Sequence, residues 1–170
     1  LTFNSGNSNL LSIADVDAGG NSVQLTLTVG NGTVSLSGVS GLSFSTGDGT
    51  SDASMVFTGT VANINTALDG LVFSPTANFS GNGSVRLQTD DQGNSGSGGS
   101  GTDDDTVTIS VSAVNDAPSL SLDSGSMSFT ENAGATQLSS GATAADADGS
   151  WNSGALVVQL TANGESADEL

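Results

Sequence analysis

The sequence predicts an all-β fold, an antiparallel sandwich with one short helix. Apolar and polar residues alternate with a period of two along most of the chain, which is the pattern of strands buried on one face. Turn-forming residues recur about every eight to twelve residues, the spacing of a sandwich. Apolar residues make up 35% of the chain and aromatic residues only 4%, a composition that suits thin β-layers better than a thick helical core.

The strand pattern is clearest in residues 22–29, where Val23, Leu25, Leu27 and Val29 share one face. Asn31 and Gly32 follow, and this pair is a strong signal for a tight hairpin, so residues 32–37 are expected to return antiparallel. The full set of predicted strands is 1–3, 10–13, 22–29, 32–37, 42–45, 54–59, 71–75, 84–91, 106–114 and 119–122.

One segment breaks this alternation. Residues 60–68 place Val61, Ile64 and Leu68 at helical spacing, and Thr60 is a suitable N-cap. A short helix is therefore predicted to cross from one sheet to the other and to close one end of the sandwich.

A Gly- and Ser-rich stretch, residues 92–101, separates two predicted strands. It is expected to form a long hairpin loop with acidic ends, Asp90 and Asp91 on one side and residues 103–105 on the other.

The charge balance excludes several functions. Eighteen acidic residues face a single cation, Arg86, which gives a net charge of -17 that would repel nucleic acid and anionic lipid. Hard divalent cations, Ca²⁺ first, are the natural partners of so many carboxylates. The chain has no Cys, His or Lys, so thiolate, imidazole and Schiff-base chemistry are excluded and no enzymatic activity is expected. No apolar run approaches the roughly 20 residues of a membrane helix and no signal peptide is present, so we expect a soluble chain or a fragment of a longer protein.

An internal repeat sets the expected domain organisation. Residues 127–164 resemble residues 1–32, with Phe129 matching Phe3 at a period of about 126 and small insertions between. We expect one complete repeat in residues 1–116 and the beginning of a second in residues 117–170. The joint is the sequence Val-Asn-Asp-Ala-Pro ending at Pro118, which is stiff because proline keeps the residue before it extended.

Acidic motifs recur at matching positions of the two copies. Asp15 and Asp17 match Asp146 and Asp148. The first pair lies in the sequence Ala-Asp-Val-Asp and the second in Ala-Asp-Ala-Asp. On an extended segment, the two aspartates would point to the same face and could share one ion. The alternative is an acidic turn, because Asp and Gly favour turns.

These motifs, their order and the Asn-Asp-Ala-Pro joint resemble cadherin repeats, and more closely the cadherin-like tandem repeats of giant bacterial surface proteins and adhesins. The resemblance covers the whole chain. It implies an immunoglobulin- or cadherin-like sandwich on the bacterial cell surface or outside the cell, with a role in adhesion, and with neighbouring repeats, or identical chains in a fibre, as partners.

The resemblance also implies Ca²⁺ sites between repeats. Its implied ligands are Asn115 and Asp116 facing Asp146 and Asp148, Asp15 and Asp17 supported by Asp90 or Asp91, and Glu131 serving the far junction of its own repeat. Three departures argue for one or two ions only: Ala113 replaces a linker aspartate, Asn4 or Ser5 stands where the second copy has Glu131, and residues 74–81 lack an acidic pair.

Alternatives remain open. Asn115 and Asp116 could form a simple Asx-turn before proline, and residues 103–105 could be a solvated loop end. Trp151 could stack on a sugar, as in a carbohydrate- or receptor-binding module, or cover the end of the sandwich. The incomplete second copy would expose strand edges, so the chain could also be a filament subunit that assembles by β-strand complementation.

Overall fold

The structure is a computed structural model that describes residues 1–94, 99–123, 128, 130, 132–137 and 139–149. The chain divides into two compact units, Leu1–Val114 and Asn115–Leu170. The division falls after Val114, two residues before the boundary predicted from the sequence. Each unit is described by itself below.

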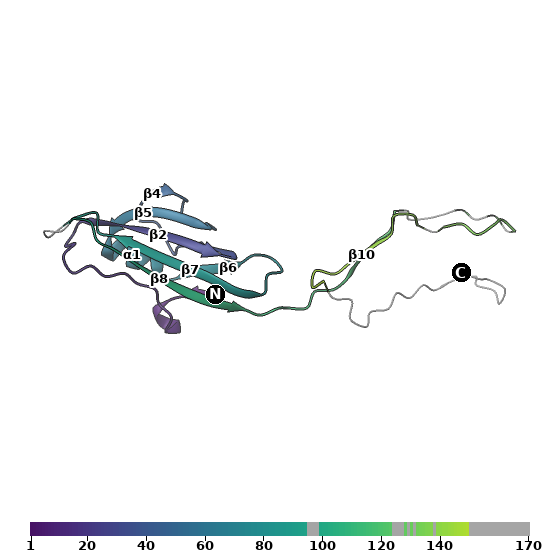
Figure 1. The fold of residues 1–170 in the computed structure, drawn as a ribbon, viewed down its shortest axis with the longest axis horizontal. Coiled ribbons are helices and arrows are strands. Elements are labelled where there is room, and N and C mark those ends of the chain that lie inside the picture. Colours follow the sequence, from purple (N-terminus) through teal and green to yellow (C-terminus); the bar gives the residue numbers. More distant parts are fainter. Residues whose placement is uncertain (95–98, 124–127, 129, 131, 138, 150–170) are drawn as a thin grey trace. The chain divides into compact units, whose positions relative to one another are not determined.

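The first unit is an antiparallel all-β sandwich with one short α-helix, which confirms the predicted fold class. Its larger sheet has the strand order β4-β5-β2-β7-β8 (Figure 1). The strands are β2 (Ser22–Gly30), β4 (Ser43–Thr46), β5 (Ser54–Thr60), β7 (Gly81–Asp90) and β8 (Thr102–Val111). Central strand β2 alternates as predicted, with Val23, Leu25 and Leu27 buried.

A smaller sheet of three strands faces this one across the core. Its order is β1-β6-β3, with β1 at Thr2–Phe3, β6 at Leu71–Pro75 and β3 at Gly32–Ser35. Side chains from both sheets meet in one apolar cluster that includes Phe57, Phe73 and Val34, all nearly inaccessible to solvent. The core is mostly aliphatic, and one aromatic pair, Phe44 and Phe57, has ring centroids 5.1 Å apart.

The predicted helix is confirmed as α1, Val61–Leu68, which connects β5 of the larger sheet to β6 of the smaller one. Thr60 is its N-cap, and its hydroxyl accepts a hydrogen bond from the Asn63 N–H at 3.2 Å. Ile64 and Leu68 are fully buried. The helix therefore carries the chain from sheet to sheet while covering the core.

The predicted hairpin at Asn31 and Gly32 is wrong. β2 and β3 lie in different sheets, and β3 pairs with β6. Asn31 adopts a left-handed conformation with φ of 59°, and its backbone oxygen accepts from Thr76 at 3.0 Å. A Cβ on Gly32 would come within 2.5 Å of the Ser74 oxygen, so the close approach of the strands requires glycine there. The pair turns the chain between layers and does not reverse it within one sheet.

Residues 10–13, predicted as a strand, are not in a strand either. The Asn65 side chain of α1 takes the place of a neighbouring strand on one side of this segment. Its Oδ1 accepts from the Ile13 N–H at 2.8 Å, and its Nδ2 donates to the Ile13 oxygen at 2.9 Å. A side-chain amide has the same donor and acceptor as a peptide group, so it can hold an extended segment without forming a ladder.

The hairpin of β7 and β8 extends further than predicted. Their antiparallel register runs from Gly81–Val111 to Asp90–Thr102. The acidic residues 103–105, expected at the end of a loop, therefore lie within β8 as exposed strand residues. The strand also ends at Val111, before the predicted end at Val114.

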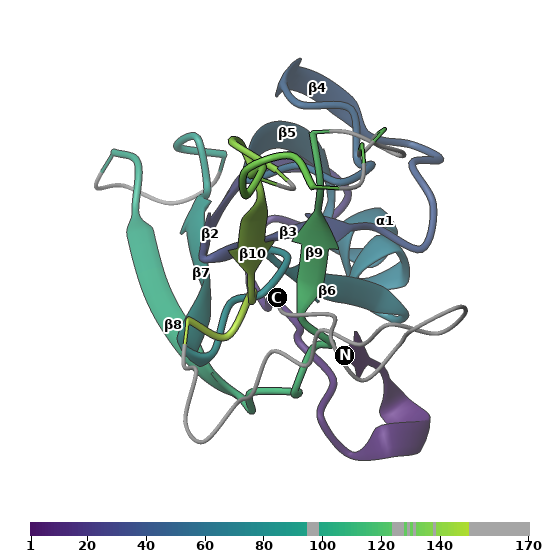
Figure 2. The same cartoon turned by 90° about the vertical axis from the view of Figure 1, so that its right-hand side faces the viewer.

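In the second unit, the described strands are β9 (Ser119–Ser121) and β10 (Thr143–Ala145), which pair antiparallel (Figure 2). β9 was predicted within residues 119–122. Phe129, Glu131 and Trp151 lie outside the described residues.

Candidate metal-binding site

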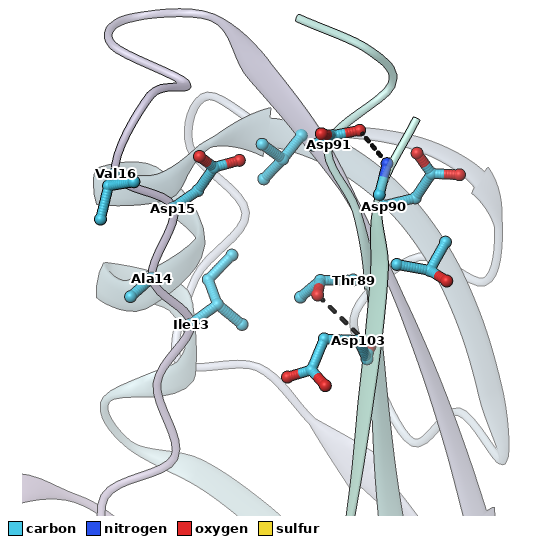
Figure 3. Close-up of a pocket in the computed structure, with 11 residues that line it drawn as sticks. Ile13, Ala14, Asp15, Val16, Thr89, Asp90, Asp91 and Asp103 are labelled. Carbon is cyan, nitrogen blue, oxygen red and sulfur yellow. Dashed lines mark hydrogen bonds between the residues drawn. The ribbon is translucent and has the colours of Figure 1, made fainter. Parts of the chain in front are cut away.

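The residues predicted to bind Ca²⁺ fall into two groups, one in each unit. In the first unit, an acidic hollow lies between the segment 13–16 and the adjoining ends of β7 and β8 (Figure 3). Four aspartates line it: Asp15, Asp90, Asp91 and Asp103. The structure thus brings Asp15 to the same hollow as Asp90 and Asp91, residues 75 or more positions later in the chain.

The Asp15 side of the hollow is a turn. The Asp15 Oδ1 accepts from the backbone N–H of Asp17 at 3.1 Å and from that of Ala18 at 2.9 Å. Ala18 is buried, and its oxygen accepts from the Asn21 N–H at 2.9 Å, immediately before β2 begins. The expectation of an extended Asp-x-Asp segment is therefore wrong here, because one carboxylate oxygen of Asp15 closes an Asx-turn.

The opposite side of the hollow is the loop that joins β7 to β8. The Asp91 Oδ1 accepts from the N–H of Gly93 at 2.8 Å and from that of Gly101 at 2.7 Å, which ties the two ends of the loop together. The backbone N–H of Gly93 and then that of Gly101 hold the pKa of Asp91 below its ordinary value of 3.8, with the Ser100 hydroxyl adding to the effect. Asp91 therefore keeps its negative charge while it accepts hydrogen bonds from both ends of the loop.

The other two aspartates on this side of the hollow, Asp90 and Asp103, make different contacts. The Asp90 Oδ1 accepts from the Gln92 N–H at 2.7 Å and from the Ser100 hydroxyl. Asp103 pairs with Thr89 in the ladder, and its side chain projects toward Ile13 (Figure 3). Together with Asp15, these side chains bring negative charge to the hollow from three separate backbone segments.

Arg86, the single cation among the side chains, does not neutralise the hollow. Its guanidinium binds Asp104 through Nε, at 2.9 Å from Oδ2, and through a second contact from Nη2. Arg86 therefore forms an ion pair with a carboxylate of the neighbouring strand β8. Both side chains are more than 40% exposed, so the pair contributes little to stability.

The second group lies within the second unit. The Asp116 N–H donates to the Asp148 Oδ2 at 2.7 Å, and the Asp148 N–H donates to the Asp146 Oδ1 at 2.9 Å. Asn115 Nδ2 donates to the Asp116 oxygen at 3.1 Å. The sequence Asn115-Asp116 and the Asp146–Asp148 turn are therefore brought together, 30 or more residues apart in the chain.

The two Asp-x-Asp motifs share one hydrogen bond. In each, the carboxylate of the first aspartate accepts the N–H of the second, at 3.1 Å in the first unit and 2.9 Å in the second. The motif is thus a turn that the carboxylate of its first aspartate closes. This shared turn also fits the internal repeat.

The donors in both groups are carboxylate and amide oxygens, the ligand type that Ca²⁺ prefers. Within the described part of the chain, however, no three acidic side chains lie close enough together to hold one metal ion. The donor chemistry therefore fits the ion, while the carboxylates would have to move together, or be joined by donors from a neighbouring repeat, to complete a coordination shell.

Sequence reasoning missed one highly connected carboxylate, Asp123. It accepts hydrogen bonds from the hydroxyls of Ser139 and Ser140 and from the N–H groups of Ser140, at 3.0 Å, and Gly141, at 2.8 Å. These bonds, the Ser139 hydroxyl first, hold its pKa far below the ordinary range. The available signal was an aspartate just after the predicted strand 119–122 and a Ser-Ser-Gly sequence, residues 139–141, just before β10.

Glu131, the remaining predicted ligand, lies outside the described residues. No helix in the described part of the chain has the length and apolar character needed to span a membrane. No protein family, curated protein or solved structure matches this chain.

Proposed function

We propose that this chain is a non-enzymatic structural module of a long extracellular protein, in which Ca²⁺ bound at the Asp-x-Asp turns stiffens the connection between repeats. The observation that carries this proposal is the recurrence of the same carboxylate-closed turn in both units. In the second unit, this turn is hydrogen-bonded to Asp116, directly after the unit boundary.

The charge distribution supports a cationic partner. The acidic hollow collects four aspartates with no basic side chain among its lining residues, and the whole chain has one cation for 18 acids. When bound, Ca²⁺ would supply positive charge that offsets the repulsion between these carboxylates. The chain's own residues would position the oxygens: Asp15, Asp17, Asp90 and Asp91 in the first unit, and Asn115, Asp116, Asp146 and Asp148 in the second.

Calcium binding can be measured directly by titration calorimetry on the full chain after chelator treatment. We expect Asp15→Asn and Asp146→Asn each to weaken binding, because each removes a charged donor. Asp48→Asn is the matched control, since Asp48 lies outside both groups and its carboxylate accepts a hydrogen bond from the Thr50 N–H. The double variant Asp15→Asn, Asp146→Asn should bind Ca²⁺ least. A heat of binding equal to that of the wild type would contradict the proposed ligands.

The stiffening role requires a second measurement. Small-angle scattering with Ca²⁺ and with chelator should show a narrower distribution of interunit distances with the ion, while circular dichroism shows the sandwich folded in both. Identical scattering in the two conditions would refute the rod function even if calcium binds.

A second function has a separate observation behind it, a groove between residues 10–14 and strands β7 and β8 that is lined by both apolar and acidic side chains. It supports assembly of identical chains into a fibre by strand addition. A carbohydrate- or receptor-binding role would use Trp151, which lies outside the described residues, so no described contact favours it.

A further inference from the structure

The sequence Asn-x-Ser/Thr, with no proline in the middle position, occurs three times in this chain, at residues 31–33, 78–80 and 82–84. In secreted proteins this sequence is the acceptor for N-linked sugars. The transferase uses the amide nitrogen of the asparagine and the hydroxyl two residues later. The three copies are equivalent as sequence motifs, so only their structures can distinguish them.

The fold brings all three copies to one end of the first unit. The Asn31 Nδ2 donates to the Asn82 oxygen at 3.1 Å, and the Asn31 oxygen accepts from the Thr76 N–H at 3.0 Å. Thr76 begins the loop that contains Asn78 and joins β6 to β7 (Figure 1). The three asparagines can therefore be compared at one place on the molecule.

The copy at residues 82–84 lies inside β7. Its last residue, Ser84, pairs with Gly30 of β2 on one side and with Thr108 of β8 on the other. Gly83, in the middle of the motif, is buried. An enzyme that must surround this segment can reach it only after β7 has separated from its neighbours, which requires local unfolding of the sheet.

The copy at residues 31–33 is engaged at both of its reactive positions. The amide nitrogen of Asn31, the atom that would receive the sugar, already donates to Asn82. Thr33, which carries the required hydroxyl, lies in β3 and pairs with Ser74 of β6. Modification of Asn31 therefore requires both the loss of a hydrogen bond and the release of a paired strand.

The copy at residues 78–80 lies entirely outside the strands. It belongs to a turn in which the Phe79 N–H donates to the Thr76 oxygen at 3.1 Å. Asn78 has φ of 60°, a left-handed conformation that asparagine adopts readily. Asn78 and Ser80 are both exposed, and neither side chain makes a hydrogen bond within the part of the chain that the structure describes. Both reactive groups are therefore accessible in the folded chain.

We propose that Asn78 is an attachment site for an N-linked sugar, and that the fold withholds Asn31 and Asn82 from the same modification. The donor is a sugar activated as a diphosphate. In the transfer, the Asn78 Nδ2 forms a bond to the anomeric carbon of the sugar while the bond from that carbon to the diphosphate oxygen breaks. The diphosphate leaves with the electron pair, and the amide loses one proton to the transferase.

The sugar would leave the acidic hollow uncovered. Strand β7 runs from Gly81, beside the turn, to Asp90, which lines the hollow. At a rise of about 3.3 Å per residue, the two ends of this strand are about 30 Å apart. The inference rests on the extracellular location in the proposed function, but it does not depend on calcium.

Transfer to the folded full chain tests the proposal. The chain is incubated with a nucleoside-diphosphate hexose and a soluble transferase specific for Asn-x-Ser/Thr, and the product is measured by intact mass. We expect the addition of a single hexose. Cleavage after Phe79 separates Asn78 from Asn82 and allows mass spectrometry to locate the sugar, which should be on Asn78.

Two sets of variants show whether the motif itself is used. Asn78→Asp keeps a residue that tolerates the left-handed conformation but removes the amide, so it should lose the hexose completely. Ser80→Ala should also lose the hexose, because the hydroxyl is absent. Ser80→Thr, which keeps a hydroxyl, should retain it.

Synthetic peptides separate the effect of the fold from that of the sequence. Peptides of residues 28–36 and 80–87 should accept the hexose at Asn31 and Asn82, because neither segment is held in a sheet once it is removed from the chain. An unmodified Asn78 in the folded chain would overturn the proposal, as would transfer to Asn31 or Asn82 as fast as to Asn78. Unreactive peptides would show that sequence, and not the fold, withholds these two sites. Calcium titration reads a different property, so failure of either proposal is visible without the other.

Discussion

At the scale of single residues, Asn65 replaces a missing strand. Its side chain makes two hydrogen bonds to the backbone of Ile13, and both are partly buried. We expect Asn65→Ala to destabilise the first unit by about 1–3 kcal/mol, because two partly buried backbone groups lose their partners. Chemical denaturation measures this loss. Asn63→Ala removes an exposed amide from the same helix and should change stability by less than about 0.5 kcal/mol. Equal effects of the two substitutions would contradict this role.

Asp91 gives a pH-dependent prediction. Hydrogen bonds from Gly93 and Gly101 lower its folded-state pKa below the ordinary 3.8. A lowered pKa stabilises the fold at pH values above 3.8, and this contribution is lost as the pH falls through the folded-state value. Acid titration of stability should therefore be less steep below pH 3.8 in Asp91→Asn than in the wild type.

The matched control for this titration is Asp105→Asn, which removes the same charge from the same hairpin but not from the loop contacts. It should keep the acid dependence that Asp91 produces. The carboxyl carbon signal of Asp91, followed by NMR, reports the titration of the residue itself. A midpoint at or above 3.8 would refute the assigned hydrogen bonds.

At the scale of elements, the helix α1 depends on its first residue. The Thr60 hydroxyl satisfies the N–H of Asn63, one of the free donors at the helix start. Thr60→Ala should cost about 1 kcal/mol in the free energy of unfolding, and Thr60→Ser should restore most of it. Thermal or denaturant unfolding of the two variants tests this. A serine variant as unstable as the alanine variant would show that the hydroxyl is not the source of the effect.

Elements were predictable where one face of a strand or helix is buried. The alternation around Leu25 and the helical spacing of Ile64 and Leu68 are direct consequences of burial, and both predictions hold. Partner choice was not predictable in the same way. Asn31 adopts a left-handed conformation before Gly32, but such a turn does not specify whether the next strand joins the same sheet or the opposite one. The pairing of Gly32–Ser35 with Leu71–Pro75 is a long-range choice.

The candidate site was predictable only in its composition. Repetition of the Asp-x-Asp motif singled out Asp15 and Asp146 as ligands, which stays a prediction. The expected extended geometry was wrong because each carboxylate accepts the backbone N–H two residues later, as in the alternative of an acidic turn. Asp123 escaped notice because its partners are hydroxyl and N–H groups of residues 139–141, which carry no charge pattern in the sequence. Calcium binding stays a prediction.

At the scale of the whole molecule, charge repulsion should limit stability. A net charge of -17 with a single basic side chain leaves the folded chain under mutual repulsion of its carboxylates, which salt screens. The melting temperature should rise between about 0.01 and 0.5 M NaCl.

A millimolar addition of Ca²⁺ should raise the melting temperature further than NaCl at the same ionic strength, since bound ions stabilise the folded state by mass action. A melting temperature independent of NaCl would contradict the repulsion, and equal effects of the two salts would argue against specific binding.

The position of Arg86 also determines how the folded protein resists trypsin-like proteases. Trypsin-like enzymes cut after Lys or Arg, and Arg86 is the only such residue among 170. It lies in the middle of β7, paired with Thr28 on one side and Thr106 on the other, so its backbone is held between two neighbouring strands. Cleavage there requires the central sheet to open. The folded chain should therefore survive in a trypsin-rich environment, and its conversion into two fragments of 86 and 84 residues would time each opening of the sandwich.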